Sequence, residues 1–547
     1  MSNLEQELEQ AKLRIKQLED EKRDTSSRLI KESKKANELL NVIIPLGIAL
    51  SSEKNLNRLL EKILVGAQGI CHADAGTIYI KEGNELYFKI IHNSSLNIKW
   101  NDEKVSQEGF KPILIFDENS NEYNKNNIAT LAAYEATTVN IPNAYENTQF
   151  DFSGTKKFDS ENNYHSTSFL TVPLKNYHNE VIGVLQLINA QNPATGEIIA
   201  FDEEKQMFVE SLSSLAATAI DNQMLLNSQK ELLDSFIRLI SDAIDKKSPY
   251  TGGHCKRVPE LTEMLVKAAV KQKEGPFSSF SMSEDDLYEV KTAAWLHDIG
   301  KITTPEYVVD KATKLETIYD RIETVKLKLL NKKKDIQLSG KGPEDPECLK
   351  TKADLEYLEK ANVGGEFLSD EDADKIKEIG SGTYIDFEGN EQKLLTDDEV
   401  KNLSISRGTL TDEERKIIND HIVVTIQMLE RLPLPKNLKR IVEYAGGHHE
   451  KMDGSGYPNG LTKEQMSVPA RVMAIADIFE ALTASDRPYK KGKTLTEALK
   501  IMSFMKKDKH IDEDLYELFM RERLFEDYAK KFLKPEQIDE VDINLFL

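Results

Sequence analysis

Cysteine is scarce in this 547-residue sequence, and long apolar runs are missing. The three cysteines, Cys71, Cys255 and Cys348, are far apart and odd in number, so no disulfide framework is predicted. The longest apolar stretch, Leu40 to Leu50, is too short to span a bilayer and contains Pro45. The first residues, MSNLEQELEQAKLRIKQ, are too polar for a signal peptide. A soluble, cytoplasmic protein is therefore expected.

Basic residues are outnumbered in this chain. The sequence has 72 Lys and Arg against 93 Asp and Glu, a net charge of −21. This balance argues against a nucleic-acid-binding surface, because binding to a phosphate backbone needs a basic face. A small anionic substrate is still compatible with it, if metals and a few local cations hold that substrate. The length exceeds what one hydrophobic core supports, so two or three folded units are expected.

Two stretches have the alternating 4-3 apolar spacing of a coiled-coil seam. The first is short and is equally consistent with a single solvated helix; it consists of Leu4, Leu8, Ala11, Ile15 and Leu18. The second continues without a break through Leu215, Ala219, Asn222, Leu226, Gln229, Leu233, Phe236 and Ile240. Polar Asn222 and Gln229 in such a seam would fix its register and favour a parallel pair. We therefore expect a homodimer whose long helix joins two domains.

Between these seams, residues 41–212 mix helix and strand. Two hairpins are predicted from alternating apolar residues, one turning at Glu82-Gly83-Asn84 and one near Asn176 to Asn179. This order, with the phrase LTVPLKN…EVIGVLQLIN, resembles a GAF domain. The resemblance implies an α+β sensory domain with a central antiparallel sheet and an unidentified small ligand. Residues 100–160 are polar and Asn-rich and are predicted to form a mobile loop over a possible pocket. Cys71, His165 and His178 are interpreted as ordinary core or loop residues.

From Leu232 to residue 530 the pattern is helical almost throughout, with one interruption. Residues 313–404 are rich in Lys, Glu and Asp, and two stretches with helical spacing predict a charged helical hairpin inserted into the domain. It could serve as a partner surface or lid, or be a solvated decoration.

Five of the ten histidines lie in this C-terminal half together with two notable aspartates. They are His254, His297, His421, His448 and His449, with Asp298 and Asp477. His297 and Asp298 are predicted to emerge at the end of a buried helix, and His421 from a helix that begins with a capping box from Thr411 to Glu414. Asp477 interrupts an apolar helix, where a carboxylate is costly unless it is paired or bound to a cation. Imidazoles with carboxylates suit Fe, Mn or Zn.

The motifs around these residues resemble a known family. His297-Asp298-Ile299-Gly300-Lys301 is similar to the signature of the HD phosphohydrolase superfamily, and HHEKMDGSGYP, residues 448–458, matches the loop of its HD-GYP branch at every position. YTGGHCKRV, NDHIVVT and ARVMAIADIFEALTASDRPYKKG occur in family order. The resemblance implies an all-α domain that hydrolyses cyclic di-GMP to the linear dinucleotide, and in some members on to GMP.

The resemblance also implies roles for individual residues. One metal would be held by His254, His297, Asp298 and Asp477, and Asp298 would bridge to a second metal held by His421, His448 and His449. His297, Asp298 and Lys301 are the predicted catalytic residues. Lys301, Tyr457, Arg487 and Lys490 are the predicted substrate contacts, with surface charge as the alternative for Arg487 and Lys490. Two ions, Fe or Mn, are expected, because Tyr250 occupies the position where members with a third metal have a glutamate.

Three alternatives remain open from the sequence. The domain could be another HD phosphohydrolase such as a nucleotidase, a domain that binds cyclic dinucleotides or partners without hydrolysis, or a hydrolase of cyclic GMP-AMP. The predicted organisation is an N-terminal helix or coiled coil (1–40), a sensory domain (41–212), a linking dimer helix (213–245), a catalytic domain (246–505) and a helical tail (506–547).

Overall fold

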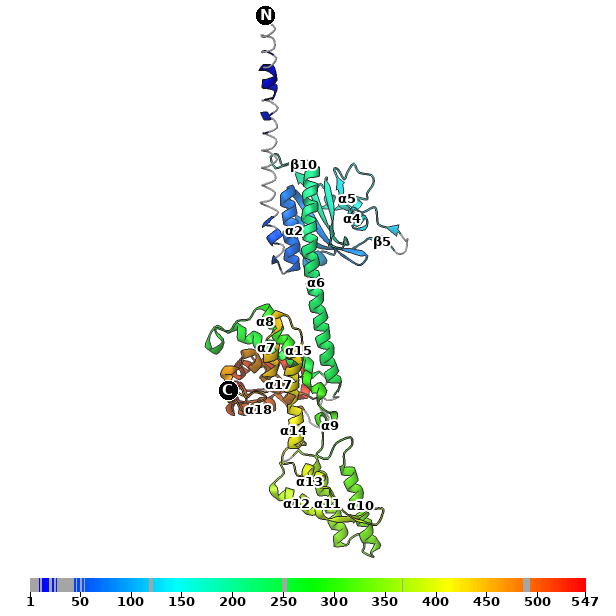
Figure 1. Ribbon diagram of the computed structural model, residues 1–547, viewed down its shortest axis with the longest axis vertical. Coiled ribbons are helices and arrows are strands. Elements are labelled where there is room, and N and C mark those ends of the chain that lie inside the picture. Colours follow the sequence, from blue (N-terminus) through cyan, green and yellow to red (C-terminus); the bar gives the residue numbers. More distant parts are fainter. Residues whose placement is uncertain are drawn as a thin grey trace. The chain divides into compact units, whose positions relative to one another are not determined.

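The computed structural model describes residues 55–117, 122–247, 253–365, 367–485 and 492–547, and before them only 12–18 and a few shorter segments. The chain forms two compact units, Met1–Glu231 and Leu232–Leu547 (Figure 1). Of the short N-terminal seam, only Ile15 and Leu18 are among the described residues, and both are helical and exposed. None of the helices described is both long and apolar enough to cross a bilayer.

The first unit is built on an antiparallel sheet with the strand order β3-β2-β1-β9-β8-β7. The strands are β1 (Ala73–Glu82), β2 (Glu85–Asn93), β3 (Ile98–Trp100), β7 (Val139–Ile141), β8 (Phe169–Lys175) and β9 (Val181–Gln191), with β4 (Ile113–Leu114) on β2 and β10 (Ile198–Ile199) on β9. Both predicted hairpins are present: β1 pairs with β2 across a turn in which Gly83 has a φ of 60°, and β8 pairs with β9. The α+β fold expected of this region is confirmed.

The two faces of this sheet are covered differently. On one face, helix α2 (Leu56–Cys71) and the start of α6 (Glu203–Lys247) pack against Ile78, Val172 and Leu185 in a continuous apolar core. On the other face, Thr77, Tyr79 and Gln186 line a cavity of about 540 Å³. The covering segment is not the loop that was predicted, because it contains α3 (Asp102–Gln107), α4 (Ile128–Glu135) and α5 (Ser153–Asn162).

Helix α6 runs for 45 residues and contributes to the cores of both units. Its predicted seam is mostly exposed: Leu215, Leu226, Phe236 and Ile240 are 47%, 58%, 54% and 37% exposed. Two seam residues, Ala219 and Leu233, are instead partly buried, because each packs against the apolar core of its own unit. Leu225, Leu232 and Leu239 are also exposed, at seven-residue intervals beside the seam.

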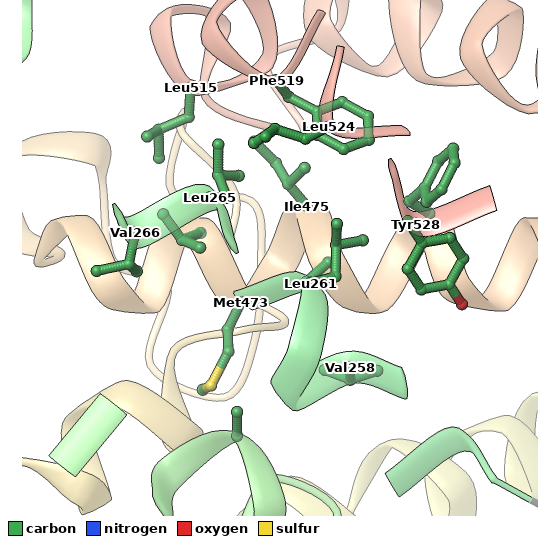
Figure 2. Packing of buried hydrophobic residues seen from close by; sticks show 14 of the residues in the cluster. Val258, Leu261, Leu265, Val266, Met473, Ile475, Leu515, Phe519, Leu524 and Tyr528 are labelled. Atoms are coloured by element: carbon green, nitrogen blue, oxygen red, sulfur yellow. The ribbon is translucent and has the colours of Figure 1, made fainter. Parts of the chain in front are cut away.

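The core of the second unit is formed by helices from distant parts of the sequence. They are α7 (His254–Lys271), α8 (Glu284–Leu296), α15 (His421–Arg431), α16 (Ile441–Gly446), α17 (Val468–Thr483), α18 (Leu495–Lys507), α19 (Glu513–Arg521) and α20 (Leu524–Phe532). In Figure 2, Leu261 and Leu265 of α7 lie near Ile475 of α17, with Phe519 and Tyr528 from the C-terminal helices beside them. The C-terminal segment therefore packs into the same core.

The inserted segment is a small folded body with an apolar core of its own. The predicted helical hairpin is present as α10 (Ile322–Leu338) and α11 (Pro346–Asn362), which pack together. The hairpin prediction was incomplete, because α12 (Asp370–Ser381), α13 (Asp397–Leu403) and a small ribbon of β11 (Thr383–Ile385) and β12 (Glu391–Lys393) complete the core. The buried residues of these elements are spread thinly among charged ones, so their sequence lacks a clear apolar stripe.

A buried lysine ties this body to the rest of the second unit. The ammonium of Lys311 lies 2.8 Å from Asn402 Oδ1 in α13 and 2.8 Å from both carboxylate oxygens of Glu414 in α14 (Asp412–Asn419). The Lys311 side chain is fully buried, whereas that of Glu414 is 16% exposed. Removing one partner of such a pair leaves a charge without compensation, which is strongly destabilising.

We predict that Lys311→Met lowers the free energy of local opening in α13 and α14 by about 3 kcal/mol. Native-state hydrogen exchange of residues 397–403 and 412–419 measures this change. Lys352→Met is the matched control, because it removes an exposed pair with Glu356 on α11 and is expected to leave the exchange of these segments unchanged. Equal exchange in the two variants would contradict the prediction.

Candidate metal site of the helical domain

Several predicted site residues lie where helices of the second unit begin or end, whereas Asp477 lies within α17. His297 directly follows the last residue of α8, and Asp298 precedes the short 3₁₀ helix η2 (Ile299–Thr303). His421 is the first residue of α15, so the predicted helix through it is interrupted at Asp420, although the capping box from Thr411 to Glu414 is present. The interruption lets the His421 ring turn toward Asp298.

Gly300 allows α15 to approach the His297-Asp298 turn. A Cβ atom at this position would lie 1.9 Å from the carbonyl oxygen of His421 and 2.7 Å from the amide nitrogen of Thr425. The backbone amide of Gly300 donates to the Thr425 hydroxyl at 2.9 Å. Glycine is therefore required sterically, and the close approach puts the Asp298 carboxylate within reach of His421.

Two groups of potential ligand atoms face the carboxylate of Asp298 from either side. Its Oδ2 atom lies 3.1 Å from His254 Nε2 and 3.2 Å from His297 Nε2, and Asp477 Oδ1 is 3.4 Å from His254 Nε2. Its Oδ1 atom lies 3.1 Å from His421 Nε2. His421, His448 and His449 form the second group, in which the Nε2 atoms of His421 and His449 are 3.2 Å apart.

Backbone carbonyls fix how three of these imidazoles are oriented. The Nδ1 atoms of His297, His421 and His448 lie 2.8, 2.6 and 2.7 Å from the carbonyl oxygens of the residues three positions earlier. A carbonyl oxygen only accepts, so the proton in each of these bonds is on Nδ1. Nε2 of each ring therefore faces the site, which is the usual orientation of histidines that bind metals.

The second group has lone pairs that no protein donor satisfies. Among the described residues, His448 Nε2 and Asp298 Oδ1 are buried without a hydrogen-bond partner. Asp298 Oδ1 lies 3.1 Å from His421 Nε2, the ring nitrogen that does not contact a backbone carbonyl. Buried lone pairs such as these are satisfied by a proton or by a metal cation. The donor set therefore fits a metal.

The pKa values in the two groups differ in direction. Burial lowers the pKa of His449 to about 4 and, together with the neighbouring His449 and His297 rings, holds the pKa of His448 well below its ordinary value. Both rings are thus neutral at pH 7 and available as ligands. In the first group, burial lowers the pKa of His254, but the charge of Glu480 and the hydrogen bonds to Asp298 and Glu480 together raise that pKa to about 10. Without a metal ion, the raised pKa values of His254 and His297 keep these two rings protonated beside the carboxylates at neutral pH.

Glu480 contacts the ring of His254 on the side away from Asp298, and Arg257 contacts Glu480. Neither residue was predicted from the sequence. Glu480 Oε2 accepts a hydrogen bond from His254 Nδ1, and Oε1 lies 2.7 and 2.6 Å from the Nε and Nη2 atoms of Arg257. Glu480 is 1% exposed and lies one helical turn after Asp477 on α17. A second carboxylate in the same apolar helix was the available signal.

The loop from His448 to Pro458 is held by Glu450 and by glycines. Glu450 is buried and accepts from the backbone amides of Asn459 and Leu461 at 2.7 and 2.9 Å. A Cβ atom on Gly456 would lie 2.3 Å from the amide nitrogen of Lys451, so only glycine allows the loop to fold back. The Tyr457 ring stacks on His449, with centroids 4.8 Å apart. Tyr457 thereby covers one side of the second group.

Among the lysines and arginines that the structure describes, Lys301 contacts Asp298 of the first group directly. Its ammonium lies 2.5 Å from Asp298 Oδ2. Burial lowers the pKa of Lys301, but the charges of Asp298 and Asp477 outweigh it and raise that pKa, so Lys301 is positive at neutral pH. Arg487, Lys490 and Tyr250 lie outside the described residues.

Models of known protein families match one segment in each of the two units. A GAF domain model matches residues 55–220, and an HD domain model matches residues 396–515. The chain contains a GAF domain and an HD domain. The HD match includes His421, His448, His449 and Asp477, whereas His254, His297 and Asp298 precede it. HD-domain phosphohydrolases depend on metals, which agrees with the two groups of potential ligands.

Relatives were found in several bacteria. The 3′3′-cGAMP-specific phosphodiesterase 3 of Vibrio cholerae is 24% identical over 343 residues, covering 59% of this chain and 51% of the relative. The 3′3′-cGAMP-specific phosphodiesterase 1 of the same organism is 41% identical over 15% of this chain and 19% of its own length. A cyclic di-GMP phosphodiesterase of Pseudomonas aeruginosa is 38% identical over 21% of this chain and 26% of its own length. The chain thus spans about half the length of the first of these relatives and less of the others.

Solved structures resemble the GAF domain. The GAF domain of an Acinetobacter phosphoenolpyruvate-protein phosphotransferase is 17% identical in sequence to the matched part of this chain. The match covers 35% of this chain and 98% of that domain, with a TM-score of 0.26.

We predict that Glu480→Ala weakens Mn²⁺ binding by about 10- to 100-fold, because His254 loses the acceptor that orients its ring. Glu480→Gln keeps an acceptor oxygen and is expected to weaken binding less. Isothermal titration of the metal-free protein with Mn²⁺ measures both. Glu430→Gln, on the exposed side of α15, is the control and should bind like the wild type. Wild-type affinity in Glu480→Ala would show that His254 needs no such support.

Proposed function

We propose that the chain is a metal-dependent phosphodiesterase that hydrolyses a cyclic dinucleotide, with cyclic di-GMP as the first candidate substrate. The observation that carries the proposal is the single buried carboxylate of Asp298, whose two oxygens face two groups of imidazoles. Such an arrangement suits two metal ions that share one carboxylate. The relatives named as cyclic dinucleotide phosphodiesterases support the choice of substrate class.

In this proposal each group of ligands holds one divalent ion, Fe or Mn. His254, His297, Asp298 and Asp477 would hold one ion, and His421, His448 and His449, together with Asp298, would hold the other. When bound, the two ions supply the Lewis acidity that phosphodiester hydrolysis requires. Hydrolysis forms a bond between a water oxygen and phosphorus and breaks one between phosphorus and a ribose oxygen, which takes up a proton. A single such step gives the linear dinucleotide.

The remaining residues bind and orient the substrate. Lys301 is positive and adjacent to Asp298, so it is suited to hold a non-bridging phosphate oxygen. His297 and Asp298 act together with Lys301 as the catalytic residues. Tyr457 closes one side of the site, where its ring would stack on a base of the substrate. Arg487 and Lys490 are proposed as further phosphate contacts from the sequence alone, and the expectation of two ions rather than three rests on Tyr250.

Cyclic GMP-AMP is the second candidate substrate, because both of the Vibrio cholerae relatives described above are named for it. A domain that binds cyclic dinucleotides without cleaving them is the alternative from another class. It is disfavoured because every predicted ligand among the described residues lies in one of the two groups or within 3.4 Å of it.

We predict that protein loaded with Mn²⁺ or Fe²⁺ converts cyclic di-GMP to the linear dinucleotide, which accumulates when only two ions are present. Chromatography of products over time, with cyclic GMP-AMP offered in parallel, measures substrate preference and the end point. Replacing both His297 and Asp298 by Ala should abolish turnover, whereas Glu430→Gln should leave it unchanged. Unchanged turnover in the double variant would refute the proposal, and binding of either dinucleotide without cleavage by the wild type would favour the alternative.

We further propose that the protein is a homodimer paired along α6. From residue 221 to 236, both the seam and its flanks expose leucines, including Leu225, Leu226 and Leu232. A solvated helix with so much exposed apolar surface is stabilised by a partner. The repeat at 4-3 spacing, with Asn222 and Gln229 in the seam, fits a second copy of the same helix in parallel.

For the dimer, we predict that light scattering gives about twice the chain mass of 62.0 kDa. Leu226→Lys should shift the protein toward the monomer, because Leu226 lies in the seam and is 58% exposed within its own chain. Ser228→Lys, two residues further along and off the seam, should leave the dimer intact. Monomeric wild-type protein at micromolar concentration would contradict the prediction.

We also propose that the GAF domain regulates the catalytic domain by binding a small ligand. A cytoplasmic location is proposed as well, in keeping with three cysteines that are buried and free.

A further inference from the structure

The last turns of α6 contact the segments that carry His254, His297 and Asp298. Ile237 and Ile244 of this helix are buried in the core of the second unit. On the same side of the helix, Ser241 is fully buried and Asp245 is 7% exposed. Buried polar side chains in a helix need partners, and each of these finds one outside α6.

Ser241 binds the segment before the His297-Asp298 pair. Its hydroxyl donates to the carbonyl oxygen of Trp295 at 2.7 Å. Trp295 lies in the last turn of α8, where backbone carbonyls have no partner within the helix. This bond therefore fixes the end of α8 from which His297 and Asp298 emerge.

Asp245 caps the helix that begins with His254. The amide of Gly253 donates to Asp245 Oδ2 at 3.0 Å, and the amide of Cys255 lies 3.5 Å from Oδ1. Gly253 is the N-cap of α7 and has no side chain with which to cap it. Asp245 supplies that function from another helix and so fixes the position of His254.

Lys247 binds the turn that carries Lys301. Its ammonium lies 3.3 Å from the carbonyl oxygen of Lys301, 2.5 Å from that of Ile302 and 2.7 Å from that of Thr304. These carbonyls belong to the end of η2, and an ammonium has three donors for them. The backbone of Lys301 is thus tied to the last residue of α6.

We propose that the C-terminal end of α6 is a positioning element of the metal site, in which Asp245 positions His254 and Lys247 positions Lys301. The role of Lys301 in this inference rests on the proposed function. A slip of α6 by one residue moves these side chains by about 1.5 Å, which is enough to break every one of the bonds. Misplacement of reacting groups by about 1 Å can lower a rate by roughly 100-fold. Axial movement of α6 therefore changes activity.

The role of Asp245 is tested by metal affinity, which requires no turnover. Asp245→Ala is expected to weaken Mn²⁺ binding about 10-fold, and Asp245→Asn, whose amide oxygen still accepts from Gly253, should recover most of it. Asp242→Asn is the control, because it removes an exposed pair with Lys256 between the same two helices. If Asp245→Ala and Asp242→Asn bind Mn²⁺ equally, Asp245 does not position His254.

The role of Lys247 is tested by kinetics at full metal occupancy. Lys247→Met is expected to lower kcat about 10-fold with unchanged metal content and a smaller change in KM, a split that general unfolding would not produce. Lys247→Gln, with two donors, should be intermediate. Lys246→Met alters the exposed neighbour and should match the wild type. A kcat for Lys247→Met within twofold of the Lys246→Met value overturns the assignment.

The two proposals can fail separately. If wild-type protein loaded with metal cleaves neither dinucleotide, the proposed function fails, whereas the assignment of Asp245 is still decided by the Mn²⁺ titration.

Discussion

The helical domain is organised around one buried carboxylate. Asp298 is 2% exposed, and an ionised carboxylate at such a depth is costly unless positive charge surrounds it. Lys301 supplies part of that charge. Burial raises the pKa of Asp298, but the nearby His297 and Lys301 lower it by more, so the carboxylate stays ionised. Its other oxygen faces His421. The two oxygens of Asp298 thus contact histidines from different helices. The ends of α7, α8 and α15 must therefore lie close together at this point.

This meeting of helices imposes constraints on residues that are not themselves predicted metal ligands. Gly300 is needed because α15 passes too close for any side chain. Glu480 is needed because Nδ1 of His254 contacts a carboxylate, whereas Nδ1 of His297, His421 and His448 contacts a backbone carbonyl. Carbonyl bonds require only that the histidine lies near a helix end. A carboxylate is negatively charged, so Glu480 makes Nε2 of His254 more basic than a backbone carbonyl would.

The site was predictable where its residues are contiguous. His297-Asp298 and the loop from His448 to Pro458 are read directly from the sequence, as are the alternating strands of the GAF sheet. Glu480 and Arg257 were not predicted, because they are 223 residues apart and their pairing depends on how α7 packs on α17. The helix interruption at Asp420 and the core of the inserted body also escaped prediction. In both, tertiary contacts outweigh a local pattern that favours a continuous helix or a solvated surface.

Helix α6 combines two kinds of constraint along one element. Its ends are fixed by the cores of the two units, through residues such as Ile220 and Ile237. Its middle exposes leucines that no other described part of the chain covers. Helical propensity alone stabilises such a stretch weakly, because most helix stability in proteins comes from packing of an apolar face. Pairing with a second copy would supply that packing. The hydrogen bonds from Ser241, Asp245 and Lys247 would then make the register of the pair a determinant of the geometry around Asp298.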